Sequence, residues 1–400
     1  MMRNYSIISL LCVLVCLRSS SLTLSILDPL DFLALQSIRK TLEDLPGSDF
    51  FTSWDFTSDP CGFSGVYCDE DSKKVIALNL GDPRAGAPGL TGRIHPSIGK
   101  LSSLAEFSIV PGRIYGVLPP TISKLKNLKF LAVSKNFISG AIPDSISEIP
   151  NLRTLDLSYN QLNGSIPGSL GTLPFLSSLI LCHNHLTGSV PTFGSQTLTR
   201  LDLKHNHLTG LITPSTLPTS LQFLSLSQNN LTGPVDRVLL RLNRLNYLDL
   251  SMNRFVGAIP ASIFTFPLTN LQLQRNQFTG QIRPLDQVSI PTVDLSHNNF
   301  GGQISSMFSS VQNLFLNNNK FIGEVPNVFV DKLMAEGIQI LYLQHNFLSR
   351  MEIDPTAEIP VSTSLCLQYN CMVPPVQTPC PFNAGTEKAR PTTQCMEWRG

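Results

Sequence analysis

The sequence predicts an α/β solenoid, in which short repeats form a right-handed superhelix with a parallel β-sheet along its concave side. A thirteen-residue pattern recurs along the chain, and its clearest copy runs from Leu155 to Pro167 as L-x-L-x-x-N-x-L-x-G-x-I-P. The Asn of this pattern returns at eleven positions, mostly 21 to 24 residues apart: Asn136, Asn160, Asn184, Asn206, Asn229, Asn253, Asn276, Asn298, Asn319, Asn346 and Asn370. A fixed period in this range indicates stacked repeat units that share one continuous core.

Each part of the repeated unit has a physical role. The Leu-x-Leu segment predicts a short strand whose two leucines point into the core while the residues beside them face outward. The short amide side chain of the Asn can bond backbone groups where the strand bends away, so stacked copies should form a ladder. Two weaker units precede the run, at Leu78-x-Leu80 and at Phe107-x-Ile109, where Gly112 takes the place of the Asn.

Composition supports one long core and an extracellular destination. The chain has 400 residues, of which 42% are hydrophobic and 14% are charged. Residues 1–21 contain Arg3 and an apolar run from Ile7 to Leu17, which predicts a cleaved secretion signal. No later segment reaches the roughly 18 apolar residues of a transmembrane helix. Without Arg3 and Arg18 the chain has 27 basic and 28 acidic side chains, a balance that argues against nucleic acid as a partner.

The expected organisation has four parts. After the signal peptide at 1–21, we expect an N-terminal cap at 28–74, about 12 repeat units at 75–363, and a last strand with a Cys-rich C-terminal cap at 364–400. Asp28 and Pro29 predict the start of a helix, with the Asp as its N-cap. An insertion from Val330 to Glu336 predicts one or two further helical turns.

The N-terminal stretch carries a specific resemblance. Trp54, Asp59-Pro60-Cys61, Phe63, Gly65-Val66 and Cys68 follow the order W-x(n)-D-P-C-x-W-x-G-V-x-C, with Phe63 in place of the second Trp. This stretch resembles the N-terminal cap of plant leucine-rich-repeat proteins. The Gly-x-Ile-Pro close of several units and the stretches from Ser364 and from Cys395 are similar to secreted plant members without a kinase domain. Their broader relatives are polygalacturonase-inhibiting proteins, receptor-like proteins and receptor-kinase ectodomains.

The resemblance implies a leucine-rich-repeat superhelix with disulfide-capped ends and a role in extracellular recognition. Six cysteines lie at the ends of the repeats: Cys61, Cys68, Cys366, Cys371, Cys380 and Cys395. In a secreted chain this placement predicts stapled caps, with one staple between Cys61 and Cys68. Because Cys366 and Cys371 lie across an extended strand end, too far apart to bond, we favour Cys371 with Cys380 and Cys366 with Cys395.

No constellation for catalysis is present, so we predict that the chain is not an enzyme and needs no cofactor. Cys182, His183, His185, His205 and His207 occupy matching positions in two adjacent units, which raises the question of a metal site. The position before the ladder Asn also holds Lys, Tyr and Gln in other units, so we interpret it as exposed and variable and expect no metal. For the lone Cys182 we expect an inert, partly shielded thiol, with an intermolecular disulfide as the alternative.

The outward positions of the strands are the better candidate for function. Aromatic and branched side chains flank the leucines in several units: Phe130, Phe223, Tyr247, Phe315, Ile340 and Tyr342. Amides lie beside them: Asn270, Gln272, Asn313 and Gln344. We predict that a protein or peptide docks on this concave face, centred on Phe223, Tyr247, Asn270, Phe315 and Tyr342. The neighbouring His297 and His345 would add positive charge below about pH 6.5.

Two glycosylation sequons, at Asn163 and Asn230, follow the ladder Asn on the turn side and should leave the concave strands open. The leading hypothesis is a secreted receptor-like protein, in the extracellular space or cell wall or peripheral at the plasma membrane. Its expected partner is a protein or peptide ligand, and a receptor-kinase ectodomain is one candidate. The alternatives are an inhibitor of a microbial cell-wall-degrading hydrolase and a structural wall protein.

Overall fold

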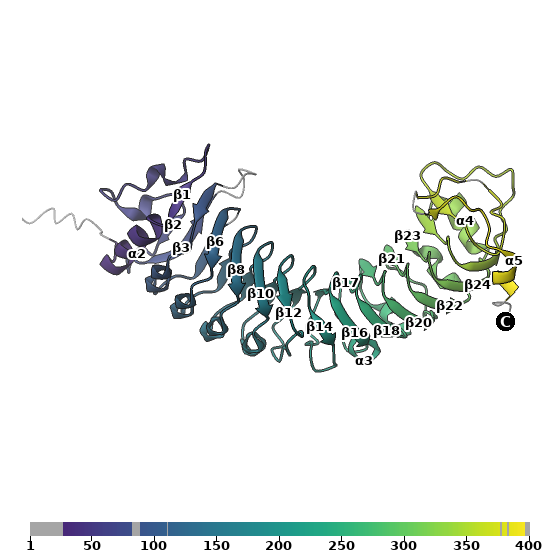
Figure 1. The fold of residues 1–400 in the computed structure, drawn as a ribbon, viewed down its shortest axis with the longest axis horizontal. Helices are drawn as coiled ribbons and strands as arrows, with labels where there is room; N and C mark the ends of the chain where they lie inside the picture. The colour runs from purple at the N-terminus through teal and green to yellow at the C-terminus, as the bar shows by residue number, and fades with distance from the viewer. Residues whose placement is uncertain (1–26, 82–88, 110, 377, 382–383, 397–400) are drawn as a thin grey trace, which may run out of the picture.

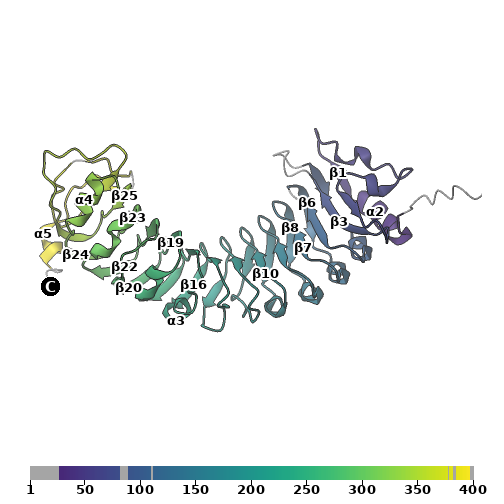
Figure 2. The same cartoon turned by 180° about the vertical axis from the view of Figure 1, so that it is seen from behind.

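The computed structural model describes residues 27–81, 89–109, 111–376, 378–381 and 384–396. Over these residues the chain forms one curved solenoid, with a cap at each end of the arc (Figure 1). The view from behind shows the strands of successive units side by side along the same arc (Figure 2). The predicted signal peptide, residues 1–21, lies outside the described residues.

The concave side is a sheet of fourteen strands that follow one another in chain order. The pairing of the first two strands is antiparallel, and the rest of the sheet is parallel, as the sequence predicts. The strands are β2 (Val66–Cys68), β3 (Val75–Leu80), β5 (Glu106–Ile109), β7 (Phe130–Ala132), β9 (Thr154–Asp156), β11 (Ser178–Ile180), β13 (Arg200–Asp202), β15 (Phe223–Ser225), β17 (Tyr247–Asp249), β19 (Asn270–Gln272), β21 (Thr292–Asp294), β23 (Asn313–Phe315), β25 (Ile340–Tyr342) and β27 (Ser364–Cys366).

Two further sheets lie on the outer side of the arc, and the sequence analysis did not predict them. They form where each unit passes through its Leu-x-Gly close. The first contains β1 (Leu42–Asp44), β4 (Leu90–Gly92), β6 (Arg113–Val117), β8 (Phe137–Ala141), β10 (Gln161–Ser165) and β12 (His185–Thr187). The second contains β14 (Thr209–Leu211), β16 (Asn230–Pro234), β18 (Arg254–Gly257), β20 (Gln277–Gln281), β22 (Asn299–Gly302), β24 (Lys320–Glu324) and β26 (Phe347–Arg350).

Helical segments are short, and apart from α2, which precedes β1, and α5, which follows β27, they lie between an outer strand and the next concave strand. The α-helices are α2 (Pro29–Arg39), α3 (Asp236–Leu239), α4 (Val328–Met334) and α5 (Thr392–Met396). The 3-10 helices are η1 (Phe50–Ser53), η2 (Pro60–Gly62), η3 (Pro96–Lys100), η4 (Pro120–Lys124), η5 (Asp144–Glu148), η6 (Gly168–Thr172), η7 (Ala261–Thr265) and η8 (Ser306–Ser310). Helix α4 confirms the helical turns predicted in the insertion, although it begins two residues earlier than predicted.

The inward side chains of every unit form one continuous core. The leucines predicted to be buried are at most 2% exposed: Leu155, Leu157, Leu248, Leu250, Leu271 and Leu273. Phenylalanines take over part of this core in later units, where Phe255, Phe278 and Phe300 stack at successive positions. The repeat register predicted from the sequence is therefore confirmed.

The Asn ladder holds the turns after the concave strands. In a typical unit, the Asn160 Oδ1 accepts a hydrogen bond from the backbone N–H of Ile138 at 2.9 Å, while Nδ2 donates to the carbonyls of Val133 and Leu157. The same pattern of one accepted bond and two or more donated bonds recurs at all eleven predicted Asn positions. These bonds satisfy buried backbone groups that no strand pairs.

The residue before each ladder Asn adopts a left-handed backbone conformation, with φ between 53° and 60°. This set comprises Lys135, Tyr159, His183, His205, Gln228, Met252, Arg275, His297, Asn318, His345 and Tyr369. A positive φ is uncommon for residues other than Gly, so we infer that the hydrogen bonds of the neighbouring ladder Asn side chains stabilise this conformation. The sequence marks this position as variable but does not reveal its conformation.

The N-terminal cap forms as predicted. The Asp28 side chain accepts hydrogen bonds from the N–H groups of Leu30 and Asp31, and Pro29 begins α2. Cys61 and Cys68 form a disulfide. Phe63 stacks on Trp54 with ring centroids 5.4 Å apart, so a single benzene ring fills the site where the resemblance has a second Trp.

The C-terminal cap corrects the predicted pairing. Cys366 is bonded to Cys380, and Cys371 is bonded to Cys395, so the favoured pairs Cys371–Cys380 and Cys366–Cys395 were wrong. The chain returns to the last strand, β27, where the Thr378 hydroxyl donates a hydrogen bond to the carbonyl of Leu365. This return brings Cys380 to Cys366, and α5 then carries Cys395 to Cys371.

Candidate functional site

Side chains on the concave sheet fall into three lanes that run along the arc. Lane 1 is the residue before Leu-x-Leu, lane 2 lies between the two leucines, and lane 3 follows them; one unit has Thr154, Asp156 and Ser158 in these places. Strands pair without a shift, so Phe223 lies opposite Tyr247 and Tyr247 opposite Asn270. Neighbouring positions in a lane are therefore about 4.8 Å apart.

A column of planar side chains occupies lane 1 on β13, β15 and β17. The rings of Phe223 and Tyr247 are stacked, with centroids 4.4 Å apart and planes 6° apart. The guanidinium of Arg200 lies 3.8 Å from the centroid of Phe223, and its Nη2 lies 3.7 Å from Oδ2 of Asp202. Sequence analysis found the two rings but missed Arg200, although a cation one unit before an aromatic in the same lane was a usable signal.

A second aromatic pair lies in lane 2 on β23 and β25. Phe315 and Tyr342 are opposite each other and meet edge to face, with centroids 5.3 Å apart. The Tyr342 hydroxyl and Ser364 Oγ are 3.2 Å apart, which fixes the ring against the last strand. The structure therefore brings the four predicted aromatics together as two pairs in different lanes, and β19 and β21 separate them.

The section between the two pairs is polar and rich in hydrogen-bond acceptors. Asn270 lies in lane 1 of β19, with Gln272 beside it in lane 2 and Gln274 in lane 3. Oδ1 of Asn270 and Oε1 of Gln274 are shielded from solvent and accept no hydrogen bond from the described residues. Asp249 and Asp294 flank Gln272 in lane 2, so this section combines two carboxylates with two unpartnered amide oxygens.

Burial shapes the electrostatics of lanes 1 and 2. Burial raises the pKa of the Asp202 and Asp294 carboxyls above the ordinary value, against the opposing effects of Lys204 and of the Ser296 hydrogen bonds. Burial also raises the pKa of the Tyr247 hydroxyl, and the charges of Asp249 and Asp202 add to that shift. These titratable groups of lanes 1 and 2 are therefore stabilised in their neutral form or by a bound positive charge, since either relieves the cost of buried negative charge.

The C-terminal end of the face differs from the prediction. Gln344 is only 2% exposed, so it lies beneath its neighbours and does not offer an exposed amide. His345 Nε2 lies 2.8 Å from the carbonyl oxygen of Ala384, so the cap engages this ring. Burial, with the nearby Arg275 and His345, lowers the pKa of His297, so its charge would rise only below the pH that we predicted.

The His cluster lies on the rim between the concave and outer sheets. His183 stacks between Tyr159 and His205, at centroid distances of 4.1 and 4.6 Å. His185 and His207 lie 5.8 Å apart with nearly parallel rings, beside a hollow of about 410 Å³. In the part of the chain that the structure describes, no three His, Cys, Asp or Glu side chains converge on a metal position.

Cys182 carries a buried free thiol in lane 3. It is 4% exposed, so it is more shielded than the sequence analysis expected. Burial, followed by the charge of Asp202, raises its pKa to about 12. The thiolate that nucleophilic or redox chemistry needs is therefore scarce at this position.

The sequons lie on the outer sheets. Asn163 is within β10 and Asn230 begins β16, so both lie on outer strands that follow the ladder Asn. Neither side chain belongs to a concave lane. Glycans at these positions would leave the three lanes uncovered, as predicted.

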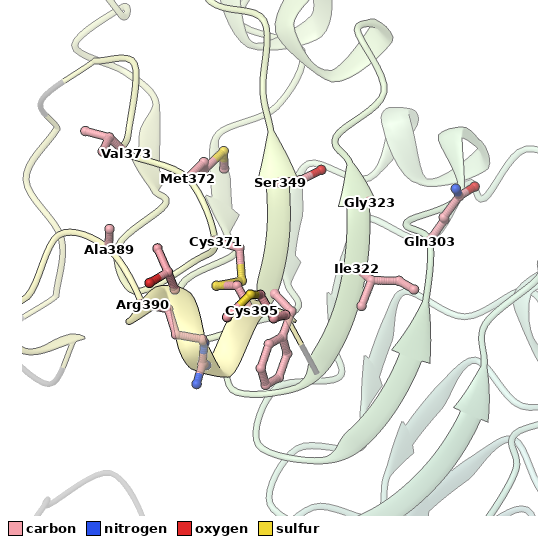
Figure 3. Close-up of a pocket in the computed structure, with 13 residues that line it drawn as sticks. Gln303, Ile322, Gly323, Ser349, Cys371, Met372, Val373, Ala389, Arg390 and Cys395 are labelled. Carbon is pink, nitrogen blue, oxygen red and sulfur yellow. A yellow bond between two sulfur atoms is a disulfide. The ribbon is translucent and has the colours of Figure 1, made fainter. Parts of the chain in front are cut away.

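A separate hollow of about 510 Å³ lies where the C-terminal cap meets β24 and β26 (Figure 3). The Cys371–Cys395 disulfide forms one side, and Ile322 and Gln303 project from the outer sheet on another. Arg390 forms part of its wall and lies over the Phe347 and Tyr369 rings, at 4.1 and 4.5 Å from their centroids. This hollow belongs to the outer side and does not join the concave lanes.

Comparison with known families identifies the repeats and the N-terminal cap. A model described as "Leucine rich repeat" matches residues 102–162 and 126–186, and related repeat models match 194–211 and 244–266. A model described as "Leucine rich repeat N-terminal domain" matches residues 28–69. Over the described residues, no helix has the length and apolar character needed to cross a membrane.

Curated relatives match over short stretches. The chain is 36% identical over 62 residues to the receptor-like kinase TMK2 of Arabidopsis thaliana, which is 16% of this chain and 6% of that protein. It is 32% identical over 89 residues to the LRR receptor-like serine/threonine-protein kinase EFR of the same plant, 22% of this chain and 8% of that one. The matched stretches thus span less than a tenth of these relatives.

Solved structures match over most of this chain. A structure of PEPR1 with AtPEP1 superimposes with a TM-score of 0.66 at 29% identity, covering 85% of this chain and 52% of that one. A plant ice-binding protein superimposes with a TM-score of 0.57 at 28% identity, covering 84% of this chain and 99% of that one. The chain therefore shares its fold with these two structures.

Proposed function

The chain is a leucine-rich-repeat protein with a plant-type N-terminal cap, and from this premise we propose that it recognises a peptide or protein on its concave face. It would act as an extracellular, receptor-like recognition module in signalling or defence. Three disulfides in the two caps fit an oxidising compartment, which supports a secreted location in the extracellular space or cell wall.

The observation that carries this proposal is the build of the concave sheet. Two pairs of partly exposed aromatics, Phe223 with Tyr247 and Phe315 with Tyr342, project from strands with a polar section between them. Aromatic side chains on a rigid support give large contact area at a small cost in conformational entropy, which is typical of interface hot spots. The similar structure of PEPR1 with AtPEP1 supports a ligand on such a scaffold.

The test begins with capture of a partner from an extracellular wall extract by the mature, glycosylated chain. The affinity of the captured partner is then measured for Phe223→Ala, Tyr247→Ala, Phe315→Ala and Tyr342→Ala. We expect losses of about tenfold or more for at least one member of each pair. A partner that proves to be a wall-degrading hydrolase, and that the protein inhibits, would support the inhibitor alternative instead.

Matched controls come from the outer sheet. Tyr115 and Phe137 are opposite-strand neighbours on β6 and β8 and are 45% and 48% exposed, so they offer similar rings on another face. Tyr115→Ala and Phe137→Ala should leave the affinity unchanged. If these two changes abolish binding while the four concave changes do not, the concave proposal is wrong.

A further inference from the structure

The column in lane 1 has one closed end and one open end. At the closed end, the guanidinium of Arg200 covers the Phe223 ring and pairs with Asp202 of its own strand. At the other end the column stops at Tyr247, because the next two residues of lane 1 are the short side chains Asn270 and Thr292. No ring or cation of this lane continues the stack past Tyr247 among the described residues.

The open end repeats the partners that hold Arg200. Asp202, Asp249 and Asp294 occupy lane 2 on alternate strands, so a carboxylate lies beside the column at both ends. Asp249 uses Oδ1 to accept from the Ser251 N–H and hydroxyl, and Asp294 uses Oδ1 to accept from the Ser296 N–H. The Ser296 side chain adds a further hydrogen bond to Asp294, whereas the hydrogen bonds of Asp249 with described residues all fall on Oδ1.

Two amide oxygens at the open end also lack donors. Oδ1 of Asn270 and Oε1 of Gln274 are buried without a hydrogen-bond partner among the described residues. Buried acceptors without a donor are costly, and rotation of the Asn270 amide toward the open end would let a donor of the ligand remove that cost. The nearest cation on this section, Arg275, is exposed on the rim and forms no ion pair with a described carboxylate within 4.0 Å.

We propose that the open end of the column, formed by Tyr247, Asn270 and Asp294, binds a cationic side chain of the partner, with arginine preferred. The planar guanidinium would extend the stack over Tyr247 and donate to Asn270 and the lane 2 carboxylates. This arrangement resembles the one that the chain makes with Arg200, except that the carboxylates Asp249 and Asp294 lie on the two flanking strands, because lane 2 of β19 holds Gln272. The inference rests on the proposed concave recognition and adds the chemistry of the partner.

Arginine fits this site better than lysine for geometric reasons. Its guanidinium is planar, stacks on aromatic faces and carries five N–H donors, whereas an ammonium is compact and donates from one point. The open end offers a ring face and several acceptors spread over two strands. An apolar side chain would leave the acceptors unpaired, and an acidic one would add repulsion.

The test uses two synthetic peptides, GPGRGPG and the same peptide with citrulline in place of arginine. Citrulline keeps the shape of the side chain but removes its charge. Binding of each labelled peptide to the full chain is followed by fluorescence anisotropy. We expect the arginine peptide to bind about tenfold more tightly, since citrulline lacks the cation–π attraction to the ring and the charge that strengthens the hydrogen bonds.

Three variants locate the site. Asn270→Arg places a cation of the chain itself beside Tyr247 and should remove the preference for the arginine peptide. Asp294→Asn should reduce that preference severalfold. Asp156→Asn changes a carboxylate of the same lane far from the open end and should leave it unchanged. Circular dichroism melting checks that each variant folds, and Tyr247→Leu provides a second test of the stack if Asn270→Arg does not fold.

Equal binding of the two peptides, or an unchanged preference in folded Asn270→Arg or Tyr247→Leu, would overturn the inference. The proposed function is tested by separate results. If the captured partner still depends on Phe223 and Tyr247 but shows no need for arginine, only the cationic chemistry is wrong. If the partner is insensitive to all four concave changes, the concave proposal fails whatever the peptides show.

Discussion

The concave sheet and the outer sheets are built from the same repeats but present different surfaces. On the concave sheet equivalent residues face each other across strands, as Phe223 and Tyr247 do. On the outer sheets the pairing is displaced by two residues, so Leu162 lies opposite Gly140 rather than opposite Ile138. Equivalent side chains therefore lie directly opposite each other on the concave sheet, whereas on the outer strands equivalent rings such as Phe255 and Phe278 stack without being directly opposite.

This difference explains where a binding surface can form. A column such as Arg200–Phe223–Tyr247 needs planar side chains at equivalent positions about 4.8 Å apart, and in-register strands supply that spacing. On the outer sheet Tyr115 lies opposite Phe137, but the two rings come from different positions of the repeat, so the pair is not continued from unit to unit. We therefore expect substitutions of residues that hold the strand register to change stability strongly. Substitutions of outward side chains on the sheet should change it less.

The largest expected effect comes from the ladder that holds the register. Asn136→Ala removes bonds to the Ile114 N–H and to the carbonyls of Ile109 and Ser134, all buried. Leaving these groups unpaired should cost about 4 kcal/mol in the free energy of unfolding, measured by urea denaturation. The adjacent Lys135→Gly, at φ 55°, should change it by about 1 kcal/mol or less. Equal effects would show that the ladder does not hold the turn.

The second prediction compares the loss of stability on removing an inward and an outward side chain of one concave strand. Leu224 is 1% exposed, so Leu224→Ala should cost about 3 kcal/mol through lost burial and a cavity. Phe223→Ala on the same strand removes only surface stacking and should cost about 1 kcal/mol. Urea denaturation measures both, and a larger loss for Phe223→Ala would contradict the assignment of the inner and outer sides.

A smaller effect is the pH dependence of lane 2. The pKa of Asp294 is raised by burial, so this carboxyl contributes stability below its unfolded pKa that is lost as the pH rises through the folded value. Asp294→Asn should therefore gain melting temperature relative to wild type as the pH rises from about 4 to 7. Asp156→Asn changes another carboxylate of lane 2 and serves as the control for this comparison of melting temperatures. A difference that shrinks over this range would contradict the stated sign.

The smallest effect concerns Cys182. Because its thiol is buried and its pKa is about 12, native protein should react negligibly with iodoacetamide at neutral pH, while unfolded protein should react fully. Mass spectrometry of the alkylated chain measures the extent. Rapid labelling in the native state would show that lane 3 opens at this position.

Much of the fold could be predicted because the repeat encodes it locally. The period of the Asn, the inward leucines and the Asp28 cap each follow from spacing and side-chain chemistry, and the structure confirms them. The C-terminal disulfides could not be predicted in this way. Their pairing depends on how the chain after Cys371 returns to β27, where Thr378 lies against Leu365, and no periodic pattern specifies that path.

The candidate site was predictable only in part. Lane positions of Phe223, Tyr247, Phe315 and Tyr342 followed from the repeat, because strand side chains alternate with period 2. The two pairs could be predicted as well, because the members of each pair share a position in neighbouring units, whereas the burial of Gln344 depends on contacts with its neighbours. Such contacts between distant segments leave no local signal in a single sequence.

Hydroxyl-radical footprinting of the chain, with and without its captured partner, tests the central claim most directly. The account predicts slower oxidation of Phe223, Tyr247, Phe315 and Tyr342 when the partner is bound, and unchanged oxidation of Tyr115 and Phe137. Protection of Tyr115 and Phe137, with no change at the four concave rings, would contradict recognition on the concave face.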